Sequence, residues 1–354
     1  MRNYIRNYLE KLADENKDSY FICMDAVENE FCPEIIKKYP KRVILTGIQE
    51  QNAVNIAIGL ALQNKKVFVS ITSIFLIRRA VDQLKLASYS NLDINFLALY
   101  AGISLVKGGY SHFGNDEYSI ISNTPNLEVY NPTNSNEVKK VMEIVKNKKT
   151  PKFISLNYCG NLSPVETTDD YSVVYKGLDE NLIITTGGAM NSNIYFRSYK
   201  KYFTDKNLNP TIINYFNINN FDKKELINLL EQYKNVIFVD YRSKGILDYE
   251  IYRLIVENNL KVNFKTFTMP FDRCNLVGDK AHYINTLMGN GNLLNEIGDF
   301  FNNNNKNLIK KRVKMKSDIE NVKINYKLLG VPCLKVKKSG KKITKKIFGL
   351  IPIK

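Results

Sequence analysis

The sequence predicts an α/β protein made of two doubly wound domains and a basic tail. Short apolar runs alternate with longer amphipathic runs in two successive sets, and the short runs show no polar face. Strands of this kind lie in parallel sheets whose two faces are covered by helices. The 354 residues, 44% of them apolar, are enough to build more than one core, which excludes a globally disordered chain.

The first domain is expected over residues 1–160. Residues 2–16 begin it as an amphipathic helix, because apolar side chains recur there at helical spacing. The predicted strands of this domain are residues 21–26, 42–47, 67–72, 94–101, 127–132 and 153–158. The helices between them are predicted at residues 52–63, 77–90, 115–122 and 135–147.

The second domain is expected over residues 173–305, after a polar segment at 159–172 that suits a linker. Its predicted strands are residues 181–188, 210–216, 235–241 and 262–269. Its predicted helices are residues 192–203, 223–233 and 246–259. The run FNNNNKN at 301–307 then breaks all periodicity and opens the tail.

The net charge of +16 belongs to the tail. Residues 306–354 carry 16 Lys and Arg against two acidic residues, whereas residues 1–305 carry 35 basic against 33 acidic residues. The body is therefore nearly neutral, and no specific nucleic-acid partner is expected. The tail contains a weak internal repeat, formed by KLLGVPCLK (327–335) and KIFGLIPIK (346–354). We expect the tail to be a solvated, flexible extension. The alternative is an anchor to an anionic membrane surface or to a protein.

Other features point to a cytoplasmic protein. The first residues contain no apolar run typical of a secretory signal, and no stretch of about 18 apolar residues exists to cross a membrane. The cysteines are odd in number and never form a CxxC pair, so they resemble reduced thiols and indicate neither a metal site nor a disulfide framework. They are Cys23, Cys32, Cys159, Cys274 and Cys333.

Residues 47–62, with the sequence GIQEQNAVNIAIGLAL, form the most informative motif. A predicted strand ends in a glycine turn here, and Glu50 stands at the start of a helix rich in small residues. By itself, a glutamate at a helix start is explained by its favourable interaction with the helix dipole. The motif therefore gains a functional meaning only from the segments that accompany it.

Several ordered segments together resemble the transketolase family. GIQEQN at 47–52 matches the family motif G-I-x-E-Q-N, and SIFLIRRAVDQL at 73–84 resembles its aromatic loop and R-A-Y-D-Q helix. Residues 108–138 are similar to its D-G-P-T-H-Q segment and the strand and helix after it, and residues 181–190 to the first strand of its third domain. The resemblance covers residues 2–300 but includes no diphosphate-binding domain. The chain thus resembles the C-terminal subunit of a split transketolase, with a pyrimidine-binding domain followed by a C-terminal domain.

The resemblance implies thiamine diphosphate as cofactor and gives Glu50 a role. In such enzymes a carboxylic acid that is hydrogen-bonded to N1′ of the aminopyrimidine promotes loss of the proton on C2 of the cofactor. Glu50 is the matching position. A partner subunit with the diphosphate-binding domain would hold most of the Mg²⁺. The active site would then lie between chains, and we expect an α2β2 assembly.

The resemblance also assigns other residues to this site. His112 matches a family histidine at the substrate oxygen, and Phe75 matches the aromatic residue that stacks on the aminopyrimidine, although core packing explains Phe75 equally well. Arg79 matches the family's loop arginine, with Arg78 as the competing alignment. Asp25 resembles a strand-end aspartate near the cofactor, and a helix cap is the alternative.

Departures from the family pattern concern the substrate. Gly108 replaces the aspartate that reads the donor hydroxyl, and Tyr100 stands near the place of a histidine. Residues 155–161 contain no cation where an arginine grips a sugar phosphate, whereas Arg2 matches a phosphate-binding arginine of the first helix. The loss of a bidentate guanidinium is not neutral for phosphate binding. We therefore expect a modified, nucleotide-linked or uncharged sugar, or a 2-oxo acid donor.

The resulting expectation is a transferase of aldehyde or ketone residues that is active only with its partner subunit and moves a two-carbon ketol unit between sugars. The tail repeats are similar to tails of some bacterial cell-surface polysaccharide enzymes, which favours a role in making sugars for surface polysaccharides. One alternative is decarboxylating condensation of a 2-oxo acid, as in deoxyxylulose-phosphate synthases or oxo-acid dehydrogenase β subunits. Another is a non-catalytic assembly subunit.

Overall fold

The structure is a computed structural model. It describes residues 2–24, 33–157, 163–190, 193–242, 244–270, 292–303, 321–328, 331–339 and 342–347. The chain divides into two compact units, Met1–Gly298 and Asp299–Lys354. The first unit holds two six-stranded sheets, so the predicted α/β fold class is confirmed. We call residues 2–157 the N-terminal lobe and residues 163–298 the C-terminal lobe.

The sheet of the N-terminal lobe is entirely parallel, with the strand order β2-β1-β3-β4-β6-β5. Its strands are β1 (Ser19–Cys23), β2 (Val43–Leu45), β3 (Lys66–Thr72), β4 (Ile94–Leu99), β5 (Glu128–Tyr130) and β6 (Lys152–Leu156). All residues of β3, β4 and β6 are buried. This is what a parallel sheet covered on both faces requires of its central strands.

Helices cover this sheet as expected from their amphipathic patterns. They are α1 (Arg2–Glu15), α3 (Pro33–Lys38), α4 (Glu50–Leu62), α5 (Ser73–Arg79), α6 (Val81–Tyr89), α7 (Glu117–Ile121) and α8 (Ser135–Asn147). α4 packs on β3 and against α5 and α6, while α1 packs against α3 and α8. The single helix predicted at 77–90 is wrong in one respect: the helix begins earlier and is broken at the buried Ala80, which leaves helical geometry with φ −130° and ψ 23°.

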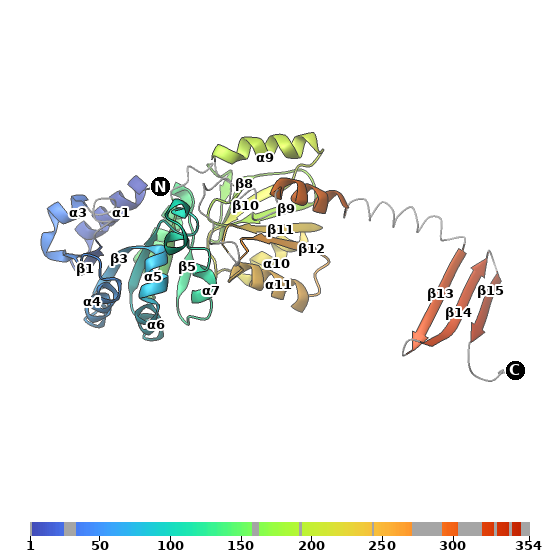
Figure 1. The fold of residues 1–354 in the computed structure, drawn as a ribbon, viewed down its shortest axis with the longest axis horizontal. Coiled ribbons are helices and arrows are strands. Elements are labelled where there is room, and N and C mark those ends of the chain that lie inside the picture. Colours follow the sequence, from blue (N-terminus) through green and yellow to red (C-terminus); the bar gives the residue numbers. More distant parts are fainter. Residues whose placement is uncertain are drawn as a thin grey trace. The chain divides into compact units, whose positions relative to one another are not determined.

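The sheet of the C-terminal lobe has the order β12-β11-β9-β10-β8-β7. Its strands are β7 (Glu166–Thr167), β8 (Tyr171–Tyr175), β9 (Asn181–Thr185), β10 (Thr211–Tyr215), β11 (Asn235–Asp240) and β12 (Asn263–Thr268). Figure 1 shows α9 (Asn193–Asp205) on one side of this sheet and α10 (Lys223–Glu231) and α11 (Leu247–Glu257) on the other. At the sheet edge, β8 runs antiparallel to both β10 and β7. β7 lies inside the segment 159–172 expected to be a linker, and β8 begins in it.

The described part of the basic tail forms a small antiparallel sheet of its own. Its strands are β13 (Asn321–Leu328), β14 (Val331–Ser339) and β15 (Lys342–Ile347), paired in that order. The solvated, flexible extension that the sequence predicts stays a prediction. The strands contain many lysines and no acidic residue, so the positive charge of the tail is spread over a sheet.

A buried ionic cluster joins the two lobes. Arg242, which follows β11, is fully buried; its Nε lies 3.0 Å from Oε2 of Glu117 on α7, and its Nη1 lies 3.3 Å from Oδ1 of Asp240. Its Nη2 donates to the Ser155 hydroxyl of β6 at 2.8 Å. Glu117 in turn accepts from the Gly102 backbone N–H at 3.0 Å. One guanidinium of the C-terminal lobe thereby neutralises a carboxylate of the N-terminal lobe.

We expect the Arg242→Met substitution to lower the free energy of unfolding by about 3–5 kcal/mol, because it leaves the Glu117 and Asp240 carboxylates buried without their cation. Urea denaturation measures this loss. Arg253→Met is the matched control, since Arg253 pairs with Glu250 and Glu257 on the exposed surface of α11, where such pairs contribute little. Equal effects of the two substitutions would contradict the structural role of Arg242.

The same cluster predicts a pH dependence. Burial raises the pKa of Asp240 to about 6, although the Arg242 guanidinium acts in the opposite direction. Between pH 4 and 6 the unfolded chain has lost this proton while the folded chain still holds it, so this carboxyl contributes less to stability as the pH rises. We therefore expect the unfolding free energy of the protein, relative to that of Asp240→Asn, to fall by about 1–3 kcal/mol across this range. Parallel pH curves for the two proteins would show that Asp240 does not titrate there.

Candidate functional site

Glu50 is the first residue of α4 and lies at the carboxyl-end edge of the first sheet. The chain reaches it through a turn at Gly47, whose φ of +64° suits a residue without a side chain. Glu50 is only 6% exposed, although it stands at a helix start. The buried Ala53 and Ala57 allow α4 to pack closely on the sheet, while the N-terminal dipole of the helix favours a carboxylate at this position.

An open depression of about 580 Å³ lies in front of this carboxylate. It is lined by Ile48, Gln49, Glu50, Gln51, Asn52, Arg78 and Arg79. Ile48 is 70% exposed at its rim. The depression therefore presents one buried acid to solvent between the start of α4 and the end of α5.

The structure brings four of the predicted site residues into one contact chain. Arg79 Nη1 donates to Glu50 Oε1 at 2.5 Å, and the Arg79 guanidinium carbon lies 4.2 Å from the centre of the Phe75 ring. The Phe75 and His112 rings meet at 5.2 Å with an interplanar angle of 70°. A carboxylate, a guanidinium, a phenyl ring and an imidazole thus lie together at one edge of the sheet.

His112 ends a loop made of two short 3₁₀ helices, Val106–Gly108 and Tyr110–His112. Its Nδ1 lies 2.8 Å from the Ser111 hydroxyl. A Cβ added to Gly108 would lie 2.7 Å from His112 Cγ, so the absence of a side chain at Gly108 is what lets the imidazole occupy this place. The glycine at position 108 and the position of His112 are therefore one structural feature.

Arg78 fastens this loop to α5. Its Nη1 donates to the Tyr110 carbonyl at 2.7 Å, its Nη2 donates to the Phe113 carbonyl at 3.1 Å, and it forms an ion pair with Asp116 at 3.1 Å. The two adjacent arginines therefore have different partners. Arg79 contacts Glu50 and Phe75, whereas Arg78 anchors the loop that carries His112.

The structure does not test the predicted roles of three other residues. Tyr100 is half-buried after β4, with a φ of +54° that is uncommon for a side chain of its size, and it packs against the core. Arg2 begins α1, but its side chain lies outside the described residues, as does Asp25 entirely. The assignments of Tyr100, Arg2 and Asp25 stay predictions.

Sequence reasoning missed the ion pairs of Asp116 and Glu117, which follow the His112 loop. Burial raises the pKa of Glu117, and Arg242 opposes this shift. Asp116 and Glu117 occur in the NDE run directly after the His112 loop, which was the available signal for an acidic anchor. Their partners, Arg78 and Arg242, lie far away in sequence, so nothing in the local pattern reveals the pairing.

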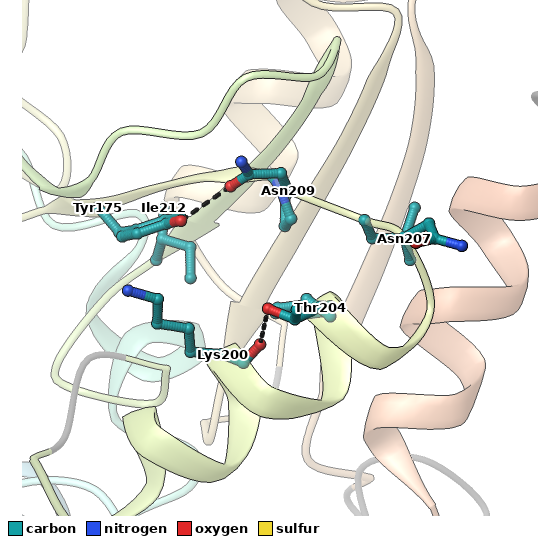
Figure 2. Close-up of a pocket in the computed structure, with 9 residues that line it drawn as sticks. Tyr175, Lys200, Thr204, Asn207, Asn209 and Ile212 are labelled. Carbon is teal, nitrogen blue, oxygen red and sulfur yellow. Dashed lines mark hydrogen bonds between the residues drawn. The ribbon is translucent and has the colours of Figure 1, made fainter.

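A second pocket lies in the C-terminal lobe between α9 and the chain before β10. Figure 2 shows Tyr175, Lys200 and Thr204 around it, with the Tyr175 hydroxyl donating to Asn209 Oδ1 at 2.9 Å. None of the predicted site residues lines this pocket. It is therefore a feature separate from the Glu50 depression.

Metal-ligating clusters and membrane-spanning helices are both missing from the described residues. Within the ranges given above, no group of three or more His, Cys, Asp or Glu side chains is arranged to hold a metal ion. In the same part of the chain, no helix combines the length and apolar character needed to cross a bilayer.

Comparison with known proteins finds a family model that matches the N-terminal part of the chain. Residues 1–158 match the family described as "Transketolase, pyrimidine binding domain". The N-terminal part of the chain is therefore similar to the pyrimidine-binding domain of transketolases.

The similarity to particular relatives points to split enzymes. The chain is 26% identical over 267 residues to one of the subunits of the apulose-4-phosphate transketolase of Actinobacillus succinogenes, covering 73% of this chain and 84% of that one. It is 27% identical over 285 residues to 1-deoxy-D-xylulose-5-phosphate synthase of Fusobacterium nucleatum, covering 78% of this chain but only 44% of the synthase. A solved structure described as "Split gene transketolase, inactive beta4 tetramer" shares the fold with a TM-score of 0.64 and 18% identity, covering 76% of this chain and 89% of that one.

The different contacts of the neighbouring arginines lead to a prediction. We expect Arg78→Met to release the His112 loop, so that backbone amides of residues 108–116 exchange hydrogen about tenfold faster or more, as local opening becomes easier. Hydrogen exchange followed by mass spectrometry measures this. Arg79→Met is the matched control and should leave the exchange of this loop unchanged. If this loop exchanges as slowly in Arg78→Met as in the unmodified protein, the three Arg78 contacts do not hold the loop.

Proposed function

We propose that this chain is the pyrimidine-binding subunit of a thiamine-diphosphate-dependent transferase that moves a two-carbon ketol unit between sugars. The observation that carries the proposal is the buried Glu50 carboxylate, which lines an open depression together with Arg79, whose guanidinium lies over the Phe75 ring. The match of residues 1–158 to the transketolase pyrimidine-binding domain and the similarity to a subunit of the apulose-4-phosphate enzyme support it.

The described residues fit one half of this cofactor. Phe75 offers a flat apolar face for an aminopyrimidine, and Glu50 offers an oxygen to a ring nitrogen from a site with little water. His112, next to Phe75, is placed to bind a substrate oxygen or to exchange a proton with it. When bound, the cofactor supplies the nucleophilic carbon for cleavage and formation of carbon–carbon bonds.

A partner subunit completes the proposed site. No metal-ligand cluster occurs among the described residues, and the proposed Mg²⁺ and diphosphate contacts are assigned to a chain with the diphosphate-binding domain. The names of two relatives support this division, since one is a single subunit of its transketolase and another is described as an inactive β4 tetramer. We propose that the working unit in the cytoplasm is an α2β2 assembly.

The proposed substrate differs from an ordinary pentose phosphate. Gly108 has no side chain to read a donor hydroxyl, and Asn157, at the end of β6, donates to the buried Tyr241 hydroxyl and the Gly187 carbonyl. The described end of β6 therefore offers no cation to a phosphate. This supports a modified, nucleotide-linked or uncharged sugar, such as one made for surface polysaccharides.

Decarboxylating condensation of a 2-oxo acid is a second candidate, because several relatives of 27–29% identity are 1-deoxy-D-xylulose-5-phosphate synthases. The two reactions differ in one product. Release of labelled carbon dioxide from pyruvate by the reconstituted pair of subunits would favour condensation, whereas ketol transfer without carbon dioxide would favour the main proposal.

Glu50→Gln tests the carboxyl at the centre of the proposal. With partner subunit, thiamine diphosphate and Mg²⁺ added, we expect at least about a hundredfold loss of turnover, because an amide cannot exchange the proton. Folding and binding to the partner should be unchanged. Glu231→Gln, at an exposed position at the end of α10 in the other lobe, is the matched control and should keep its activity. Turnover near that of the unmodified protein in Glu50→Gln would refute the assignment.

A further inference from the structure

The Arg79 guanidinium occupies the space between the two groups proposed to hold the cofactor ring. It donates in its plane to the Glu50 carboxylate at 2.5 Å and lies with its carbon 4.2 Å from the centre of the Phe75 ring. A guanidinium is flat, carries N–H donors at its rim and stacks on aromatic faces. It therefore meets the requirements of Glu50 and of Phe75 at the same time.

An aminopyrimidine would need the same two contacts in this site. Its flat face needs the Phe75 ring, and a nitrogen in its plane needs the Glu50 carboxyl. Glu50 Oε1 lies at hydrogen-bond distance from Arg79, and the side chain of Glu50 is 7% exposed. The ring and the guanidinium therefore compete for one carboxylate and one aromatic surface.

Arg79 is free to leave this position. Its side chain is 48% exposed, and it is the last residue of α5 before the helix breaks at Ala80. It lines the open depression, so an outward rotation leads to solvent. Arg78, with its three contacts to the His112 loop, has no such freedom.

We propose that Arg79 is a built-in competitor for the pyrimidine position, which it fills until the cofactor displaces it. This inference rests on the proposed function, because it assumes that Glu50 and Phe75 receive an aminopyrimidine. The apparent affinity for the ring is then reduced by the fraction of molecules in which Arg79 is bound inward. Contacts from a partner subunit to the diphosphate end supply the additional affinity, so cofactor uptake depends on assembly.

The test uses the full chain without a partner and 4-amino-5-hydroxymethyl-2-methylpyrimidine as the probe, with titration calorimetry to measure its dissociation constant. We expect Arg79→Ala to bind the probe about fivefold more tightly than the unmodified chain, the factor that about 1 kcal/mol provides. Arg253→Ala, which removes an exposed arginine elsewhere, should bind as the unmodified chain does. Arg79→Ala combined with Glu50→Ala should lose the gain.

The outcomes separate this inference from the proposed function. If the unmodified chain binds the probe and Arg79→Ala binds it equally tightly or more weakly, the competitor role is overturned and the pyrimidine site still stands. Absence of binding to every variant would count against the pyrimidine site and against the competitor with it. A second measurement is the Nε–H signal of Arg79 in ¹⁵N-arginine-labelled protein. Its hydrogen exchange should become faster when the probe binds, and an unchanged signal in a chain that binds the probe would also overturn the inference.

Discussion

The buried guanidinium of Arg242 is the interaction on which the arrangement of the two lobes depends. It belongs to the C-terminal lobe, yet it contacts Glu117 and Ser155 of the N-terminal lobe, and none of the three groups has access to water. An isolated buried charge is costly, so each group is tolerable only while the others are in place. Because Glu117 begins the helix after the His112 loop, the second lobe supports the candidate site without contributing a side chain to it.

The site is open because the elements around it come from one lobe only. Glu50 starts α4, Phe75 and Arg79 lie on α5, and His112 ends the loop after β4. These are connections at the carboxyl ends of parallel strands, where α/β proteins place ligands. One wall of the candidate site is thus built with an acid and an aromatic ring that are held on helices of a single lobe.

Much of the fold could be predicted because periodicity and capping agree with each other. The helix at 135–147 was located correctly, since Asn134 accepts from the N–H groups of Asn136 and Glu137 at its start. The break at Ala80 could not be foreseen, because alanine favours a continuous helix. At the site, the motif singled out Glu50, but which of Arg78 and Arg79 contacts this carboxylate depends on the rotation of α5. The pairing of Arg242 with Glu117 depends on the tertiary fold.

The neighbouring arginines of α5 have one more consequence. Successive residues of an α-helix are turned by about 100° around its axis, so adjacent identical side chains face different surroundings. Here that angle sends one guanidinium to the backbone of a loop and the other to a carboxylate. A deletion of one residue upstream in α5 would turn Arg79 to the direction that Arg78 has now and would turn Arg78 away from the loop. The rotation of this short helix about its axis, and not only the presence of two arginines, therefore determines which contacts form.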